Sequence, residues 1–289
     1  MLFSGTITAL VTPFNKDGSV DFERLGALVE EQIAAGIDGL VPVGTSGESP
    51  TLTMEEHGRV IAFVAERAAR RVKVIAGTGA NSTAEALHLT REAKGMGVDG
   101  SLQVCPYYNK PSQEGLYRHY MEVADVGLPV VLYNVPGRTG REIDVSTIAR
   151  LAAHPNVVAV KEAAGSVPRV SAILDACAID VLCGDDMLTV PMVSVGACGV
   201  ISVASNVVPA EMVALTHAAL DGDFARARAL HKRLYRLFRD LFIETNPVPV
   251  KAALAMMGKI EDVYRLPLCE LSERSAAQLR QTLGELGLV

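Results

Sequence analysis

Short apolar runs alternate with amphipathic segments along most of the chain. The runs are rich in β-branched residues and are bounded by glycine, proline or charged residues. Continuous apolar runs of this kind are typical of parallel strands that are buried on both faces. The pattern predicts eight strands, over residues 6–12, 39–44, 72–76, 100–104, 129–134, 157–161, 180–183 and 199–203.

Helical segments are expected between the strands, because apolar residues there recur at helical spacing. Asp21 is a suitable N-cap for the first helix, and Thr53 with Glu56 has the capping-box spacing for the second. The ranges predicted as helical between strands are 21–35, 54–70, 82–96, 114–126 and 145–153. Four more helices are predicted beyond the last strand, over 209–220, 224–242, 248–257 and 275–286.

The alternation of strand and helix implies one parallel sheet, and eight such units close into a (β/α)8 TIM barrel, an α/β fold. An open, doubly wound sheet would usually have fewer repeats. We therefore expect residues 1–222 to form the barrel and carry the active site, followed by an appended C-terminal helical region over 223–289. The leucine stripe between Leu230 and Leu241 is interpreted as packing against the barrel or a partner.

Composition and charge narrow the class of protein. The chain has 289 residues, 49% of them hydrophobic, and a net charge of −6. An acidic surface argues against nucleic acid or an anionic membrane as the main partner. No apolar run reaches the roughly 18 residues of a membrane span, and the first residues lack the pattern of a signal peptide. The five cysteines are scattered without C-x-x-C spacing, which is typical of reduced thiols in a cytoplasmic protein.

The apolar run over 157–160 ends at Lys161, and lysine is rarely buried without a function. An amine that loses hydration at the end of an apolar strand can attack a carbonyl carbon. The alternative is that Lys161 only marks where the strand reaches solvent, paired loosely with Glu162. The residues that follow the other strands favour the first interpretation.

Active sites of such barrels lie at the carboxyl ends of the strands, so the residues after each strand are the candidates. Hydroxyls and backbone amides at Thr45 and Ser46 could bind a carboxylate, and Tyr133 could move protons beside the amine. Arg138 follows the fifth strand and could form a bidentate contact with a second carboxylate. Each has an alternative. The loop with Thr45 and Ser46 could be an ordinary glycine-rich turn, Tyr133 an aromatic cap on the core, and Arg138 a surface charge.

Two other features are weaker. Asp185 and Asp186 could ligate a metal, but no histidine lies at ligand spacing, so a solvent-facing or supporting role is expected. Residues 77–82 follow a strand like a dinucleotide-binding loop, yet Ser82 replaces the third glycine and no open sheet is predicted. We therefore expect neither a metal nor a nucleotide cofactor.

Three motifs, taken in order, resemble those of a known family. They are GTSGE at 44–48, YNVPGRT at 133–139 and VAVKE at 158–162. Over essentially its whole length the chain is similar to the pyruvate-dependent class I lyases related to N-acetylneuraminate lyase. Within that family, PYYN at 106–109, Arg138 and GVIS at 199–202 are most similar to the dihydrodipicolinate synthases.

The resemblance implies a reaction that needs no cofactor and no metal. Lys161 would form a Schiff base with pyruvate. The enamine derived from it would attack the aldehyde of L-aspartate 4-semialdehyde and give 4-hydroxy-tetrahydrodipicolinate, in lysine and diaminopimelate biosynthesis. Tyr133 would relay protons, and Thr45 would link it to Tyr108 from a neighbouring subunit. Thr45 and Ser46 would hold the carboxylate of pyruvate.

The same resemblance implies further contacts and an assembly. Arg138 would hold the carboxylate of the semialdehyde, and backbone groups near Gly184 and Ile201 would line the pocket. The family is usually a homotetramer built from tight dimers, and many synthases are inhibited by lysine at the dimer interface. The residues that match this inhibitor site are Ser49, His57, Asn81, Glu85 and Tyr107. Pro50 and Met54 depart from the lysine-sensitive pattern, and a polar helix face at a subunit contact is the alternative.

Three other functions compete with this one. Another aldolase of the family, acting on N-acetylneuraminate or a 2-keto-3-deoxy sugar acid, would offer more hydroxyl partners than the cation Arg138. A catalytically idle barrel that serves as a scaffold would have no need of Lys161 and Tyr133 together. A phosphate-binding isomerase would carry a glycine-rich turn after strands seven and eight, where this chain has an acidic pair that would repel phosphate.

Overall fold

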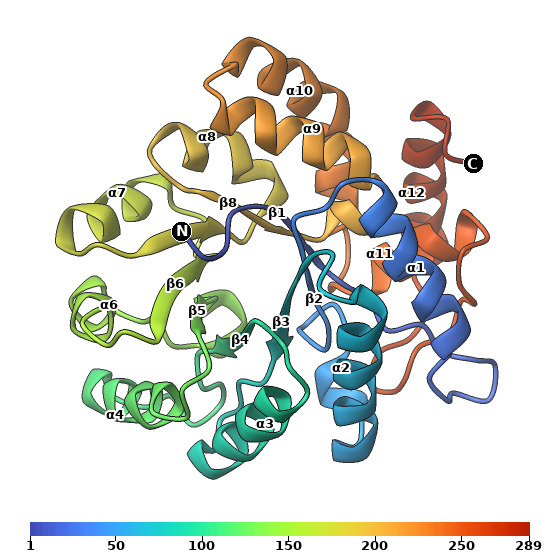
Figure 1. Ribbon diagram of the computed structural model, residues 1–289. Coiled ribbons are helices and arrows are strands. Elements are labelled where there is room, and N and C mark those ends of the chain that lie inside the picture. Colours follow the sequence, from blue (N-terminus) through green and yellow to red (C-terminus); the bar gives the residue numbers. More distant parts are fainter.

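Eight parallel strands close into a barrel in the computed structural model, which describes residues 1–289 (Figure 1). Each strand pairs with its neighbours in sequence, and β1 pairs with β8 to complete the ring. The strands are β1 Gly5–Ala9, β2 Gly39–Val41, β3 Lys73–Gly77, β4 Gly100–Val104, β5 Val130–Asn134, β6 Val157–Glu162, β7 Asp180–Cys183 and β8 Gly199–Ser202. The predicted TIM barrel is confirmed.

Helices surround the barrel and connect consecutive strands (Figure 1). They are α1 Phe22–Ala34, η1 Ser49–Thr51, α2 Met54–Ala68, α3 Thr83–Gly95, α4 Gln113–Ala124, α5 Pro136–Thr139, α6 Val145–Leu151, α7 Val167–Ala176, η2 Asp186–Leu188, α8 Thr189–Ser194, η3 Ala204–Asn206 and α9 Pro209–Leu220. Asp21 caps α1, and Thr53 with Glu56 forms the predicted capping box of α2. The apolar spacing alone gives no range for α5, α7 or α8, which are among the shorter helices.

Two strands end three residues earlier than the apolar pattern predicts. The runs over 6–12 and 39–44 leave the sheet after Ala9 and Val41. Val43 has a φ of 48°, in the left-handed region, so the backbone turns sharply out of β2 and carries the following loop onto the rim of the barrel. Residues beyond the strand ends, such as Leu10, are still buried, which is why the apolar pattern continues past the sheet.

The interior of the barrel is packed with side chains, so it is a core and not a channel. The residues that fill it include Ile7, Val41, Ile75, Leu102, Val131, Ala159, Leu182 and Ile201. A larger apolar core lies between the strands and the surrounding helices. Because both cores are closed, a site for a small molecule can form only at an end of the barrel or between helices.

Three helices follow the barrel: α10 Phe224–Asp240, α11 Val248–Met256 and α12 Glu273–Glu285. Helix α10 packs against α9, and α12 packs against α10 and α11 (Figure 1). The leucine stripe is core packing as predicted, because its members are buried or packed at the edge of the main core: Leu230, Leu234, Leu237 and Leu241. The segment that leads into α11 reaches the loop after β2, where Asn246 donates a hydrogen bond to Ser46.

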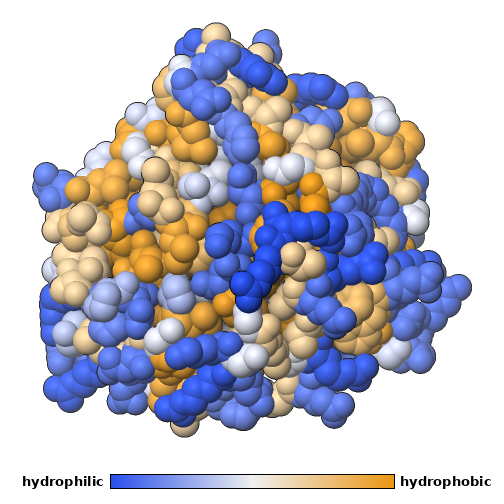
Figure 2. Space-filling model, viewed as in Figure 1, coloured by the Kyte–Doolittle hydropathy of each residue, from blue (hydrophilic) through white to orange (hydrophobic).

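The surface is mixed in character. Hydrophilic side chains dominate the face around α3 and α4 in Figure 2, whereas apolar atoms gather beside α7 and β6. Large apolar side chains that are exposed lie far apart in the sequence, among them Met54, Tyr108 and Tyr235. No helix of the chain combines the length and the apolar character that crossing a membrane requires.

Candidate active site

A cavity of about 260 Å³ opens at the carboxyl ends of the strands. It is bounded by the loop after β2, the turn after β5, the end of β6 and the residues after β7. Its lining includes six residues proposed from the sequence: Thr45, Ser46, Tyr133, Arg138, Lys161 and Gly184. Residues from four different strands are thus brought together because parallel strands place all their carboxyl ends on one face.

Lys161 lies at the end of β6 and points into this cavity. Its side chain is only 6% exposed, and its Nζ lies 4.2 Å from the centroid of the Tyr133 ring. The two residues are register partners on β5 and β6, so the sheet itself holds the amine against the phenol ring. An amine in this setting has lost most of its hydration and faces an aromatic surface, which suits attack on a bound carbonyl.

Glu162 does not pair with Lys161, because successive residues of a strand point to opposite sides of the sheet. The carboxylate of Glu162 is fully buried on the helix side, where Arg169 and Asn134 bind it at 2.9 and 3.0 Å. The alternative of a solvent-facing strand end loosely paired with its neighbour is therefore wrong. The lysine is left without a carboxylate partner on its own strand.

The loop over residues 44–48 is held from several sides. The Thr12 hydroxyl donates to the carbonyl of Gly47 at 2.7 Å, and the Ser46 hydroxyl accepts from Asn246 at 3.1 Å. A Cβ atom at Gly47 would lie 2.9 Å from the backbone of Val43, so only glycine fits this turn. The backbone amides and hydroxyls of the loop are therefore presented to the cavity in a fixed arrangement.

Arg138 lies in the short helix α5, at the rim of the cavity. Its guanidinium donates one hydrogen bond to the carbonyl of Asn246 at 3.1 Å. The side chain is exposed, and its remaining N–H groups can meet an anion that enters the cavity. The alternative of an isolated surface charge does not describe this position, since the residue lines the cavity that contains Lys161.

Two residues proposed from the sequence are not part of this cavity. Ile201 is buried in the barrel interior, in register with Ile7, and its side chain belongs to the core; the expected contact through backbone groups near it stays a prediction. Tyr108 is 91% exposed and has a φ of 73°, so within one chain it points away from the site. The family resemblance implies that Tyr108 reaches the site of a neighbouring subunit, and this role stays a prediction.

A second cavity, of about 420 Å³, lies on the outer side of the same loop. Thr45, Tyr133 and Arg138 line both cavities, so the two are separated by the candidate catalytic residues themselves. Four residues of the predicted inhibitor site line it, and the fifth donates a hydrogen bond to the Tyr107 carbonyl: Ser49, His57, Glu85, Tyr107 and Asn81. The two departures from the lysine-sensitive pattern, Pro50 and Met54, line it as well.

Burial shifts the pKa values of two residues in the second cavity, His57 and Tyr107. Desolvation lowers the pKa of His57, whose Nε2 lies 2.9 Å from the carbonyl oxygen of Gly77. Burial also raises the pKa of Tyr107, and the nearby carboxylate of Glu85 adds to this effect. Near neutral pH the cavity therefore holds a neutral imidazole and a neutral phenol, beside the carboxylate of Glu85.

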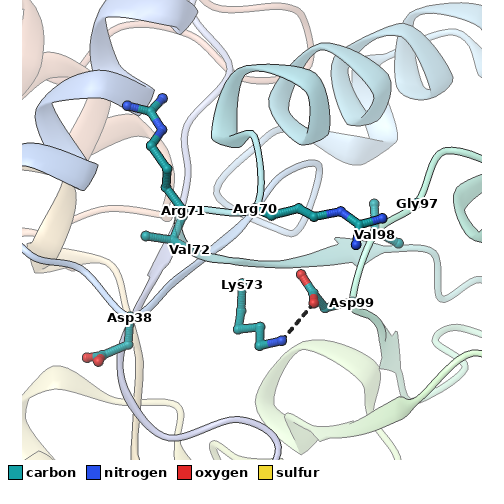
Figure 3. A pocket seen from close by; sticks show the side chains of 8 residues that line it. All are labelled: Asp38, Arg70, Arg71, Val72, Lys73, Gly97, Val98 and Asp99. Atoms are coloured by element: carbon teal, nitrogen blue, oxygen red, sulfur yellow. Dashed lines mark hydrogen bonds and ion pairs between the residues drawn. The ribbon is translucent and has the colours of Figure 1, made fainter.

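A third hollow lies at the end of the barrel opposite the cavity around Lys161. It is formed at the amino ends of β2, β3 and β4, and its volume is about 490 Å³. Lys73 is paired with Asp99 at 2.9 Å, as Figure 3 shows, and Arg71 is paired with Glu30 at 2.8 Å. Most of its charges are thus already neutralised within the protein, away from the end where such barrels carry out chemistry.

Some residues at the site were not identified from the sequence. The cavity wall also contains Met187, Val203, Phe242 and Asn246. Asn246 and Phe242 come from the C-terminal region, which carries no motif that places it over the barrel. The only available signal was the Asn-Pro pair directly before an apolar helix, and that pair by itself indicates a turn.

The acidic pair after β7 has a structural role. The carboxylate of Asp186 accepts hydrogen bonds from the backbone amides of Val203 and Ala204 at 3.0 and 2.9 Å, and thereby fixes the segment after β8. Burial raises the pKa of Asp186 to about 6. Asp185 accepts from the amide of Met187 at 2.9 Å and lines the cavity. The supporting role predicted for this pair agrees with these contacts.

Comparison with known proteins gives one consistent result. The model of the dihydrodipicolinate synthetase family matches residues 2–286. A 4-hydroxy-tetrahydrodipicolinate synthase of Geotalea daltonii is 54% identical over a 291-residue alignment that covers 100% of both chains. The crystal structure of dihydrodipicolinate synthase from Aquifex aeolicus has a TM-score of 0.97 at 52% identity and covers 99% of each chain. The structure of the enzyme from Cyanidioschyzon merolae with lysine bound has a TM-score of 0.97 at 40% identity, covering 100% of this chain and 99% of that one.

Proposed function

The chain belongs to the dihydrodipicolinate synthetase family, and from that premise we propose how its own residues carry out the reaction. The enzyme is a lyase that condenses pyruvate with L-aspartate 4-semialdehyde in lysine biosynthesis. The observation that carries the residue assignment is the buried amine of Lys161, held over the Tyr133 ring in a cavity at the carboxyl ends of the strands.

The first step is attack of the Lys161 amine on the carbonyl carbon of pyruvate. The C–N bond forms, the carbonyl oxygen leaves as water, and Tyr133 carries protons between nitrogen and oxygen. Loss of a methyl proton then converts the imine into an enamine. The position of the lysine supports this assignment, because its buried amine lies against Tyr133, a group that can exchange protons with it.

The enamine carbon then bonds to the aldehyde carbon of the semialdehyde, and the oxygen formed there takes up a proton. The amino group of the second substrate closes the ring on the imine carbon and releases Lys161. The carboxylate of pyruvate binds the amides and hydroxyls of Thr45 and Ser46, and that of the semialdehyde binds Arg138. The two anion-binding elements lie on one cavity, as a reaction between two carboxylic acids requires.

The wall of the cavity favours this pair of substrates over a sugar acid. Val135, Met187 and Phe242 present apolar atoms beside the site, and the cavity is only about 260 Å³. A polyhydroxylated chain would leave several hydroxyl groups against that wall without hydrogen-bond partners, which is costly. A short aldehyde with one cationic contact fits the surface better than N-acetylneuraminate does.

We also propose the finer features of the assembly. Tyr108 completes the site of a neighbouring subunit, because its exposed side chain has no place in the cavity of its own chain. The protein is then a homotetramer made of tight dimers, acting in the cytoplasm. Lysine binds the second cavity with its ammonium group at Glu85, which supplies a negative charge there. The barrel over 1–222 and the helical region over 223–289 together make one catalytic unit.

Borohydride reduction in the presence of pyruvate, followed by peptide mass mapping, tests the assignment. We expect one pyruvate-derived adduct per chain, on Lys161. Lys251 is an internal control, because it is also buried but is ion-paired with Glu48. An adduct on another lysine, or none with the folded protein, would show that Lys161 is not the Schiff-base residue.

A further inference from the structure

A buried ion pair lies directly beneath the loop over residues 44–48. The Nζ atom of Lys251, on α11, donates to the carboxylate of Glu48, the last residue of the loop, and both side chains are 0% exposed. No step of the proposed reaction uses either group. Two opposite charges without solvent access are expensive to bury and weak as a source of stability, so the pair calls for a specific explanation.

The surroundings of Lys251 are built to hold a cation. Its ammonium group lies 4.1 Å from the ring centroid of Phe14 and 5.2 Å from that of Tyr264. Burial lowers the pKa of Lys251, while the adjacent carboxylate of Glu48 opposes this shift. The lysine is therefore enclosed by two aromatic faces and has Glu48 as its hydrogen-bonding partner.

The loop that Glu48 terminates is strained. Val43 and Glu48, on either side of the loop residues that face the cavity, have φ angles of 48° and 55°. Such left-handed conformations of residues other than glycine persist only where the surrounding structure enforces them. The ion pair anchors one end of the loop in this conformation, and the contact between Thr12 and Gly47 fixes the residue before it.

The stretch over residues 246–251 contacts both proposed carboxylate sites. The side-chain amide of Asn246 donates to Ser46 at 3.1 Å, and its backbone carbonyl accepts from Arg138 at 3.1 Å. Lys251 adds the contact with Glu48 within the next two turns of chain. The C-terminal region is thus joined to the loop at two points, one of which is a charge pair.

We propose that Glu48 and Lys251 are positioning residues for pyruvate. By fixing the end of the loop through a buried ion pair, they hold the amides and hydroxyls of Thr45 and Ser46 at the places where the carboxylate of pyruvate binds. This inference rests on the proposed function and adds to it a role for the C-terminal helices. Neither residue touches the substrate, because both lie behind the loop.

Steady-state kinetics of three variants tests the proposal: Glu48→Gln, Lys251→Met and the double variant that combines them. We expect the KM for pyruvate to rise about tenfold or more, because small displacements of a binding group have large effects. The KM for the semialdehyde should change by less than about threefold, since Arg138 is held by the backbone of Asn246 and not by the ion pair. A purely structural role would not separate the two KM values.

Asp240→Asn is the matched control. Asp240 is also a fully buried carboxylate of the C-terminal helices, bound by Arg239, Gln278 and Thr282, and it has no contact with the loop. We expect this variant to lose stability while its KM for pyruvate stays unchanged. If the Glu48 and Lys251 variants behave in the same way as this control, the positioning role is refuted.

The double variant keeps the test decisive if a single variant does not fold. It removes both charges at nearly constant volume, so no unpaired charge is left in the core. A folded double variant with a normal KM for pyruvate would overturn the proposal. Borohydride trapping of the unsubstituted enzyme separates the two hypotheses: no adduct on Lys161 refutes the proposed residue assignment, whereas an adduct together with normal variants refutes only the positioning role.

Discussion

Replacing Arg138 by alanine separates the two halves of the reaction. Arg138 lies in α5 at the rim of the cavity, and Lys161 lies at its floor near the end of β6. The substitution removes a guanidinium whose one hydrogen bond within the protein goes to the carbonyl of Asn246. Asn246 is buried but lines the cavity, so water that fills the space left by the side chain can replace this donor, and the fold should be affected little.

The size of the effect follows from the contact that is lost. A hydrogen bond to a charged group contributes about 1.5–3 kcal/mol, and about 1.4 kcal/mol corresponds to a factor of ten. The kcat/KM for the semialdehyde should therefore fall about ten- to a hundredfold. Because the Arg138 side chain is exposed to solvent, which screens its charge, the lower end of this range is expected.

Two measurements are made on the same preparation. Initial rates at saturating pyruvate give the kcat/KM for the semialdehyde, and borohydride trapping gives the extent of imine formation with pyruvate alone. We expect the first to fall and the second to stay within about twofold of the unsubstituted enzyme, since the pyruvate carboxylate binds the loop and not the arginine.

Arg141→Ala is the control, because Arg141 is three residues away and donates to the carbonyl of Lys110 instead. It does not line the cavity and should change neither measurement. Arg138→Lys keeps the charge but loses the planar fork, and it should recover only part of the activity. Normal kinetics of Arg138→Ala with the semialdehyde would show that the acceptor carboxylate binds elsewhere.

Three further predictions concern other parts of the molecule. Tyr133→Phe should lower the rate of imine formation about a hundredfold or more while the enzyme still binds pyruvate, because it removes the proton relay; a rapid-quench trapping assay with an unchanged rate would exclude that role. Titration with lysine should inhibit the enzyme, and Glu85→Gln should weaken the apparent lysine affinity about tenfold by removing the anion of the second cavity; activity that stays flat across the titration would contradict the inhibitor site. Burial raises the pKa of Asp186 to about 6 from a usual value near 4, so the folded state holds this proton more tightly. The contribution of Asp186 to the free energy of unfolding is then largest below pH 4. This contribution falls by about 3 kcal/mol as the pH rises through 6. Asp186→Asn should remove that slope in urea denaturation between pH 4 and 7, and an unchanged slope would show that Asp186 does not titrate there.

The pattern of apolar and polar residues was sufficient for the fold class. A closed (β/α)8 barrel is one of few folds in which eight apolar runs separated by amphipathic segments bury both faces of a parallel sheet. The family resemblance implied the same fold. The strand ends were less well predicted, because apolar residues such as Leu10 and Val43 continue past the sheet and pack in the core there. The pattern of apolar residues indicates which side chains are buried. A buried residue need not be paired in a sheet, so the pattern does not fix where a strand ends.

The candidate catalytic residues were also accessible from the sequence. Lys161, Tyr133, Thr45 and Arg138 each follow or end a predicted strand, and parallel strands place all such residues at one end of a barrel. A short motif indicates where the chain turns after a strand and which reactive side chains lie there. The barrel topology then brings these motifs together at one end. Ile201 was expected to reach the pocket through backbone groups near it; its side chain faces the core, and the backbone contact stays a prediction.

The surroundings of these residues follow from the packing of the C-terminal helices on the barrel. Asn246, Phe242 and Lys251 are far from the motifs in the chain, and nothing in the sequence indicates that α11 contacts the loop after β2. Helix amphipathicity specifies a face to be buried but not the partner that buries it, because many apolar surfaces would serve equally well. Long-range contacts between polar groups, such as Glu48 with Lys251, follow from how the helices pack on the barrel. Local sequence patterns therefore specify the barrel and its reactive groups, whereas the packing of the C-terminal helices specifies how those groups are held.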